Sequence, residues 1–383
     1  MTALAPLPPT GPEPLVGPDF GSYSATDVRW LLTDLSHADL EAPVAEREAA
    51  IQSGRAHYAE SLPVEFQPDA AYTELFHRAL AEQGRRVALA TVALLHQIRA
   101  RRGDDAVLVS LARAGTPVGI LLRRYAATLG WDLPHYTMSI VRGRGIDVVA
   151  LEHLVARHDP ADLVFVDGWT GKGAITRELA AAVTALNAER GWRLDPTLAV
   201  LADPGATTDL HGTRDDFLIP SACLNSTVSG LVSRTVLNDR LLRPGQFHGA
   251  KYYAELADVD LSRHYLEAVS AHFDDVAAAG EQEAQRLLAA DRTPTWSGWR
   301  AVEEIAARHG IDDLHLVKPG VGETTRVLLR RVPWQVLVRP DRRDDLAHVA
   351  LLAEQRGVPL VEVPDLAFSC VGLIQPGLAR SEG

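Results

Sequence analysis

The sequence predicts an α/β fold built on a parallel sheet, followed by a smaller αβ unit. Three observations favour this class. Short, fully apolar runs alternate with helical patterns between residues 105 and 203, as expected for a sheet covered by helices on both faces. A second alternation of helices and strands occupies residues 299–383. The 383 residues of the chain also exceed the roughly 100–200 residues that one domain usually holds.

Composition places the chain among ordinary globular proteins. Hydrophobic residues make up 46% and charged residues 23% of the sequence. The net charge of −12 argues against nucleic-acid binding by the charge of the whole chain, although one domain could still carry a basic face. No apolar run reaches the ~18 residues of a membrane span. With Cys223 and Cys370 as the only cysteines, we expect no disulfide framework, no metal-ligating residues and a cytoplasmic location.

The elements follow in order along the chain. Residues 1–20 read as a flexible Pro-rich leader without the features of a signal peptide, and residues 21–85 as a mostly helical extension. In that extension, residues 25–35 are amphipathic, and the apolar spacing of residues 72–101 predicts a long helix. Residues 86–260 form the predicted core. A helical connector at 261–298 leads to the C-terminal unit at 299–383.

Within the core, each apolar run predicts a strand and each intervening stretch a helix. The strands are expected within residues 106–115, 136–141, 163–168 and 198–203, and the helices at 117–129, 148–157 and 174–190. Because the strand ends of such a sheet meet at one edge, ligand-binding loops are expected there.

The strongest motif covers residues 163–179, LVFVDGWTGKGAITREL. Asp167 ends a buried strand, and the loop to the next helix contains Gly171 and Gly173. Glycines let backbone N–H groups approach a ligand, and the helix N-terminus adds partial positive charge, so the loop predicts an anion site. Lys172 is followed by glycine, which excludes a P-loop, and the third glycine of a dinucleotide fingerprint is missing. A tight turn without a ligand is the alternative.

Two upstream segments could act with this loop. Residues 107–124, VLVSLARAGTPVGILLRR, predict a strand, a loop with Arg113, Ala114 and Gly115, and a helix; an ordinary turn with a surface arginine is the alternative. Residues 139–147 place Arg142 and Arg144 between glycines, which predicts a mobile cationic loop or a solvated basic hairpin.

A dense polar segment follows the predicted sheet at residues 219–238 and 246–253. It contains residues that could receive a substrate: Asn225, Ser226 and Arg234. Cys223 and His248 could instead form a thiolate–imidazolium pair for nucleophilic catalysis. A buried structural role is the alternative for the cysteine.

The two phosphate-type loops resemble those of type I phosphoribosyltransferases. The resemblance implies that Asp167 contacts the ribose hydroxyls of phosphoribosyl pyrophosphate, although Gly168 stands where most members carry a second acid. It also implies that the 5-phosphate lies on Thr170, Gly171, Lys172, Gly173 and Ala174. Arg113, Ala114 and Gly115 would meet the pyrophosphate, and Arg142 and Arg144 would close over it. The implied cofactor is Mg²⁺ held by the substrate's own oxygens.

The C-terminal unit resembles the Pelota-type RNA-binding domain. Its segment KPGVGETTRVLLRR, residues 318–331, contains a G-x-E-x-T-R helix start. The resemblance implies that structured RNA meets Lys318, Gly322, Glu323, Thr325, Arg326 and Arg330. A structural interface without RNA is the alternative.

The combination of both units resembles a bacterial family encoded in tellurite-resistance stress operons and also labelled StiP-type cysteine proteases. From these resemblances we expect a Mg²⁺-dependent phosphoribosyltransferase acting in nucleoside synthesis or salvage. The first alternative is a cysteine peptidase or acyl-transfer enzyme using Cys223 and His248. The second is a non-catalytic regulator that senses a ribosyl phosphate and binds RNA. A dimer is one oligomeric state considered.

Overall fold

The computed structural model describes residues 11–42, 59–65, 67–330 and 332–375. Its centre is a six-stranded sheet in which every neighbouring pair is parallel. In spatial order the strands are β1 (Arg29–Leu31), β6 (His135–Met138), β5 (Val107–Leu111), β9 (Leu163–Trp169), β10 (Leu198–Ala202) and β11 (His211–Thr213). The residues of β5, β6 and β10 are all buried, because helices cover both faces. The predicted parallel α/β class is confirmed.

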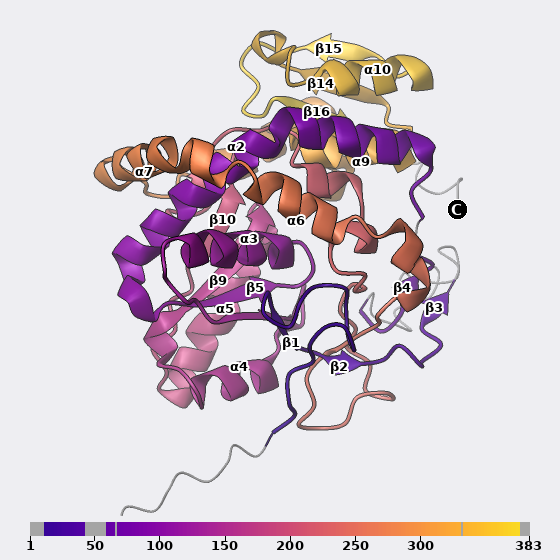
Figure 1. The fold of residues 1–383 in the computed structure, drawn as a ribbon. Helices are drawn as coiled ribbons and strands as arrows, with labels where there is room; N and C mark the ends of the chain where they lie inside the picture. Colours follow the sequence, from indigo (N-terminus) through magenta and orange to yellow (C-terminus); the bar gives the residue numbers. More distant parts are fainter. Residues whose placement is uncertain (1–10, 43–58, 66, 331, 376–383) are drawn as a thin grey trace, which may run out of the picture.

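Two separate apolar cores lie on the two faces of this sheet. One face is covered by α2 (Ala70–Arg102), α3 (Gly115–Thr128), α6 (Ser262–Ser270) and α7 (Phe273–Ala289). The other is covered by α4 (Val148–Val155) and α5 (Ala174–Arg190) (Figure 1). The long helix α2, which packs along α7, begins where the carboxylate of Asp69 accepts a hydrogen bond from the backbone of Tyr72 at 3.0 Å. It matches the helix predicted from the spacing of residues 72–101.

Among the described residues before α2, short strands and turns replace the expected helical extension at 21–85. The amphipathic stretch 25–35 forms β1 and β2 (Thr33–Asp34). Trp30 and Leu32 pack into the core on one face of the sheet, and Leu31 packs into the core on the other. A strand between two layers buries both faces, which a surface helix cannot do. Residues 43–58 of the predicted extension lie outside the described residues.

The remaining short elements connect these layers. They are β3 (Glu41–Ala42), β4 (Leu62–Pro63), β7 (Ile140–Val141), β8 (Gly145–Ile146) and β12 (Gly249–Ala250), with the 3₁₀ turns η1 (Gly103–Asp105), η2 (Pro160–Asp162), η3 (Pro220–Cys223), η4 (Ser226–Val228) and η5 (Ala254–Val259). β3 pairs with β4, β12 with β2, and β7 with β8. The predicted helical connector is divided into α6 and α7.

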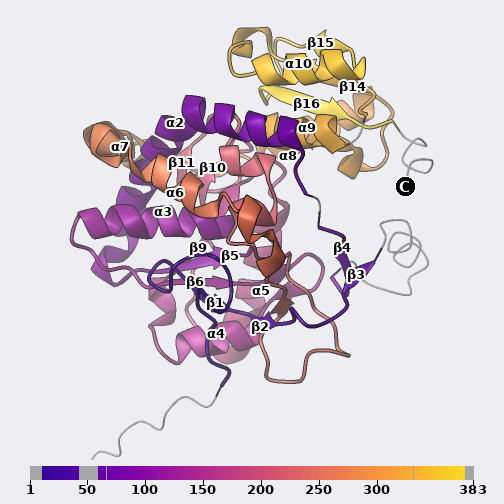
Figure 2. The ribbon, with the colours of Figure 1, turned by 45° about the vertical axis from the view of Figure 1, so that its right-hand side comes forward.

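The C-terminal unit is a four-stranded mixed sheet with three helices. Its strands lie in the order β13 (Val317–Pro319), β16 (Cys370–Leu373), β14 (Gln335–Val338) and β15 (Leu360–Glu362), and its helices are α8 (Ser297–Arg308), α9 (Gly320–Arg330) and α10 (Ala347–Arg356), with η6 (Leu314–Leu316) and η7 (Pro340–Arg342) between them. Figure 2 shows this unit beside α2, away from α4.

The apolar core beneath α2 continues without a break into the C-terminal unit. Val321 and Leu328 of α9 belong to the same buried cluster as Phe217 and Leu218, which precede η3. None of the described helices is long and apolar enough to cross a membrane.

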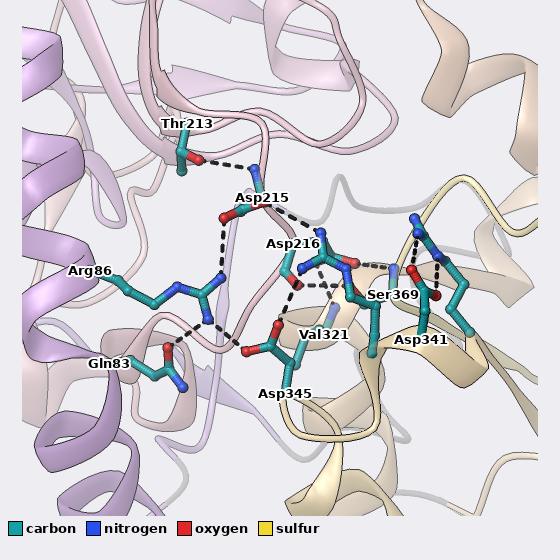
Figure 3. A network of polar contacts seen from close by, with 11 residues as sticks. Gln83, Arg86, Thr213, Asp215, Asp216, Val321, Asp341, Asp345 and Ser369 are labelled. Carbon is teal, nitrogen blue, oxygen red and sulfur yellow. Dashed lines mark hydrogen bonds and ion pairs between the residues drawn. The ribbon is translucent and has the colours of Figure 1, made fainter. Parts of the chain in front are cut away.

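A polar network joins the same parts of the molecule (Figure 3). Arg86 of α2 lies 2.6 Å from the carboxylate of Asp345 and 3.3 Å from that of Asp215. Arg342 bridges the same two acids, at 3.5 and 3.3 Å. Beside them, the buried carboxyl of Asp216 accepts hydrogen bonds from two backbone N–H groups of the C-terminal unit, those of Val321 and Ser369. The two units are therefore held by both apolar and polar contacts.

Candidate functional site

A cavity of about 260 Å³ lies where the carboxyl ends of β5 and β9 meet the C-terminal unit. Such an edge of a parallel sheet is the usual place for a ligand. Its walls come from the loop after β5 and the first turn of α3, from the end of β9, from the segment around η3 and η4, and from the start of α9. The lining residues are Arg113, Ala114, Pro117, Asp167, Gly168, Trp169, Phe217, Ile219, Ser221, Ala222, Leu224, Asn225, Val228, Ser229, Gly322, Glu323 and Arg326. The cavity thus joins residues that the sequence assigned to four different motifs, at 107–124, 163–179, 219–238 and 318–331.

Two arginines from different units converge on one amide in the cavity wall. The side-chain oxygen of Asn225 accepts hydrogen bonds from Arg113 at 3.4 Å and from Arg326 of α9 at 3.3 Å. Glu65, from the segment before α2, lies 3.4 Å from Arg113 and accepts the backbone N–H of Ser226 at 2.9 Å. This wall can offer positive charge to an anionic group from both sides.

Asp167 lies at the end of β9 on the cavity wall. Burial raises the pKa of its carboxyl to about 7, although the backbone N–H of Gly168, at 2.7 Å, opposes the shift. A carboxyl with this pKa exchanges its proton near neutral pH, which is what a general acid or base requires.

Two buried polar atoms near the cavity have no partner among the described residues. They are the indole N–H of Trp169, a residue that lines the cavity, and the hydroxyl of Ser226, which follows the lining residue Asn225. Buried polar atoms are usually paired, so these two are exceptions.

The glycine loop after β9 is packed against the C-terminal unit. A Cβ on Gly173, where φ is +68°, would lie 2.4 Å from the ring of Trp296, and one on Gly205 would lie 1.9 Å from the carbonyl oxygen of Gly171. Lys172 donates a hydrogen bond to the carbonyl of Leu314 at 3.0 Å. Close packing therefore gives these glycines a structural reason that requires no bound phosphate.

Other members of the predicted phosphate loops lie beside this joint. Thr170 is buried, and its hydroxyl lies 3.2 Å from that of Thr207. Ala174 is the first residue of α5. Gly115 begins α3, and a Cβ there would lie 2.3 Å from the carbonyl oxygen of Val166 in β9.

The arginine pair of the predicted mobile loop lies on the β7–β8 hairpin, outside the cavity lining. The backbone N–H groups of Gly143 and Gly145 each donate to the carboxylate of Glu178 at 3.1 Å. Arg142 lies 2.9 Å from the imidazole of His315, and Arg144 lies 3.8 Å from Glu60.

Cys223 and His248 are held in different surroundings. Cys223 ends η3 between two cavity-lining residues, but burial raises the pKa of its thiol to about 12, against the charge of Arg326. The imidazole of His248 lies 2.8 Å from the hydroxyl of Ser139, and its backbone N–H donates to Asp147 at 2.6 Å. Among the described residues, no hydrogen bond links the two, and none is made by the Cys223 thiol.

The residues predicted to contact RNA lie in different surroundings near the start of α9. Gly322, Glu323 and Arg326 line the cavity, whereas Thr325 is buried with its hydroxyl 3.0 Å from His348. Lys318 lies on β13 and is partly exposed. The side chain of Arg330 lies outside the described part of the chain. Arg234, from the polar segment, is exposed and does not line the cavity.

Several cavity residues were not found from the sequence. Trp169 lies within the strongest motif, and its aromatic ring beside an acid could have been a signal. Glu65 and Phe217 carried none, because they reach the cavity only through tertiary packing. Among the described residues, no group of three His, Cys, Asp or Glu side chains is placed to hold a metal ion.

The fold and the site define a two-part α/β protein in which a parallel-sheet core and a smaller αβ unit share one cavity. Residues 21–270 match the family described as tellurite-like stress resistance cysteine protease StiP, and residues 296–376 match the PELOTA RNA binding domain. The chain is 34% identical over 374 residues to the cysteine protease StiP of Acinetobacter baylyi, covering 93% of this chain and 94% of that protein. The chain belongs to the StiP family.

This membership corrects the expected activity. The phosphoribosyltransferase prediction is wrong, because the family and the relative are both described as cysteine proteases. The glycine loop that carried the prediction has a structural explanation in its packing against α8. The expected ligand, phosphoribosyl pyrophosphate, therefore loses its support, and the cysteine peptidase alternative fits the family better.

Proposed function

We propose that this protein is a cysteine-dependent protease with Cys223 as its nucleophile. The observation that carries the proposal is that Cys223 is the only cysteine within the matched range 21–270, since Cys370 lies outside it. Cys223 also follows Ala222 and precedes Leu224, both of which line the cavity. The cavity is accordingly the place where a peptide bond would be cut.

The chemistry would divide among residues of this wall. The Cys223 sulfur would attack the carbonyl carbon of the peptide bond and form a thioester, while the released amine takes up a proton. Water would then hydrolyse the thioester and restore the thiol. Asp167, with its pKa of about 7, suits the transfer of that proton. Only the thiolate form of cysteine is nucleophilic, and the charge of Arg326 favours that form. Because burial opposes it, attack requires a movement of η3 that exposes the sulfur.

The test is cleavage of a proteome-derived peptide library by the full-length protein, read by mass spectrometry. Cleavage should be lost in Cys223→Ala and kept in Cys370→Ala, which removes the other buried cysteine. Cleavage that persists in Cys223→Ala would exclude this nucleophile. The absence of cleavage by the wild-type protein would refute protease activity on peptides.

A second function is favoured by the match of residues 296–376 to the PELOTA RNA binding domain. We propose that this unit has the Pelota-type fold and binds structured RNA. For the core, the loops of β5 and β9 at one sheet edge support a phosphoribosyltransferase-type architecture used for a different reaction, since one fold can carry many activities. Binding of an RNA hairpin by the full-length protein, measured by fluorescence anisotropy, tests the RNA function.

A further inference from the structure

Basic side chains from both units gather at the seam between the β7–β8 hairpin, the start of α5 and the η6 turn. This seam cluster consists of Arg142, Lys172, Arg177, His315 and Lys318. Arg142, Arg177 and His315 are exposed, and the two lysines are partly exposed. In a chain of net charge −12 with 50 acidic residues, such a gathering is not expected from composition.

Direct contacts hold the cluster across the seam. From the core, Arg142 lies 2.9 Å from His315, and Lys172 donates to the carbonyl of Leu314 at 3.0 Å. Arg177 of α5 donates to the backbone carbonyl of Lys172 at 3.3 Å. The cations therefore lie close together at the joint between the core and the C-terminal unit, where the charges of Arg142 and Lys318 both act on Lys172.

Three members of the cluster form no ion pair with a described carboxylate. Among the described residues, none lies within the 4.0 Å of an ion pair from Lys172, Arg177 or Lys318. Burial lowers the pKa of Lys172 to about 8, and the charges of Lys318 and Arg142 act in the same direction. Burial is the main cause of the lowered pKa of Arg177 and of His315, and the positive charge of Arg142 lowers both further.

In the described part of the chain, the acids that act on the cluster are Glu178, Glu303, Asp313 and Glu323. Glu178 accepts two backbone N–H groups of the hairpin, and Asp313 accepts the backbone N–H of His315. Glu323 lines the cavity. The charge of Glu303 raises the pKa of Arg177, but the two form no ion pair. Most of these carboxylates therefore bind backbone N–H groups or line the cavity instead of pairing with the cluster.

Aromatic rings complete the surface. The guanidinium of Arg177 lies 4.0 Å from the centre of the Trp299 ring and 5.5 Å from that of Trp296. Both rings are partly exposed and belong to the start of α8. Arginine and tryptophan side by side provide the charge and the stacking surface that nucleic acids use.

We propose that RNA bound to the C-terminal unit continues across the seam cluster, so that Arg142, Lys172 and Arg177 of the core contact its phosphates. The proposal rests on the RNA-binding function proposed above. The seam cluster would give the RNA an accessible path. On α9, by contrast, three of the expected contacts line the cavity and Thr325 is buried. RNA would then lie on both units at once and hold them together.

The test uses the full-length protein and a short fluorescein-labelled RNA hairpin with an internal loop. Its Kd is measured by anisotropy over a series of salt concentrations for the wild type and for the double variant R142Q/R177Q. The matched control is R193Q/R240Q, which removes the same charge from exposed positions elsewhere in the core; the side chain of Arg193 is 81% exposed. Melting temperatures verify that all three proteins are folded.

Each lost phosphate contact weakens binding about fivefold at ~0.15 M salt, because log K falls with a slope of about −0.9 per contact. We therefore expect R142Q/R177Q to bind about thirtyfold more weakly, with a salt slope lower by about two, and the control to bind like the wild type. Equal binding by R142Q/R177Q and the control would overturn the path across the seam while leaving RNA binding intact. If the wild-type protein does not bind the RNA hairpin but binds polyglutamate, both the path across the seam and the RNA-binding function would be overturned. That result would indicate an acidic protein partner.

Discussion

The joint at Asp216 gives the sharpest test of how the two units are held together. Its buried carboxyl accepts N–H groups of Val321 at 3.0 Å and of Ser369 at 2.8 Å. Leaving a buried donor unpaired costs about 1–3 kcal/mol. Asp216→Ala leaves two donors unpaired and should lower the free energy of unfolding by about 2–6 kcal/mol. Asp216→Asn keeps one acceptor oxygen and should cost about half as much.

The effect of Asp216→Asn should depend on pH. Burial raises the pKa of this carboxyl from 3.8 to about 6, so between these values the folded protein binds more protons than the unfolded chain. The stability contributed by this group is full below pH 3.8 and is lost as pH rises through 6. From about pH 5 to about pH 8 the wild type should lose about 1.4 kcal/mol relative to the asparagine variant.

The assay is urea unfolding of the full-length protein at both pH values, followed by tryptophan fluorescence and circular dichroism, with coincident transitions required. The control is Asp215→Asn, whose half-exposed carboxylate forms ion pairs and should contribute less than about 1 kcal/mol. An Asp216→Ala protein within about 0.5 kcal/mol of the wild type at both pH values would refute the reasoning, since that is the size of an ordinary surface change.

Three further outcomes follow from the structure. Gly173→Ala should lower the free energy of unfolding by about 2–5 kcal/mol, because it combines a φ of +68° with a Cβ 2.4 Å from the ring of Trp296. Gly191→Ala, with a φ of +69° and open space around the Cβ, should lower it by about 1–2 kcal/mol in the same urea assay. Equal losses would contradict the packing argument. Arg86→Ala should lower the free energy of unfolding by about 1–3 kcal/mol, because it removes two ion pairs and the contact of the guanidinium with the Phe217 ring, 4.2 Å from its centre. The control Arg78→Ala breaks one exposed ion pair and should lower it by less than about 0.5 kcal/mol. The carboxyl carbon of Asp167 should titrate by NMR near pH 7, with its contribution to stability lost as pH rises through that value; a midpoint at its ordinary pKa would contradict the assigned burial.

The regular elements could be predicted where local pattern and tertiary burial agree. The predicted helix at 174–190 coincides with α5, because its glycine start and apolar spacing are both local signals. Residues 25–35 were predicted as a helix, because β1 is recognisable only through its partner β6, about a hundred residues away. The boundaries of the predicted domains stay predictions.

The cavity was predicted in part. Arg113 and Asp167 meet there because β5 and β9 end at one edge of the sheet, and the polar segment around η3 and η4 brings Asn225 to the same wall. Their meeting with Arg326 depends on how the C-terminal unit docks, which no local pattern encodes. The glycines after β9 illustrate a further limit: one sequence pattern suits both a cradle for an anion and a close packing joint, and only the neighbouring α8 distinguishes them.

The pairing of α2 with α7 has a consequence for how the chain is made. Roughly 170 residues separate the end of α2 from the start of its partner. At about 5–20 residues per second, the ribosome needs roughly 10–35 s to deliver α7 after α2 has emerged. Over that interval the residues of α2 that later pack on α7 lack this partner, so the nascent chain should depend on chaperones more than the finished protein does.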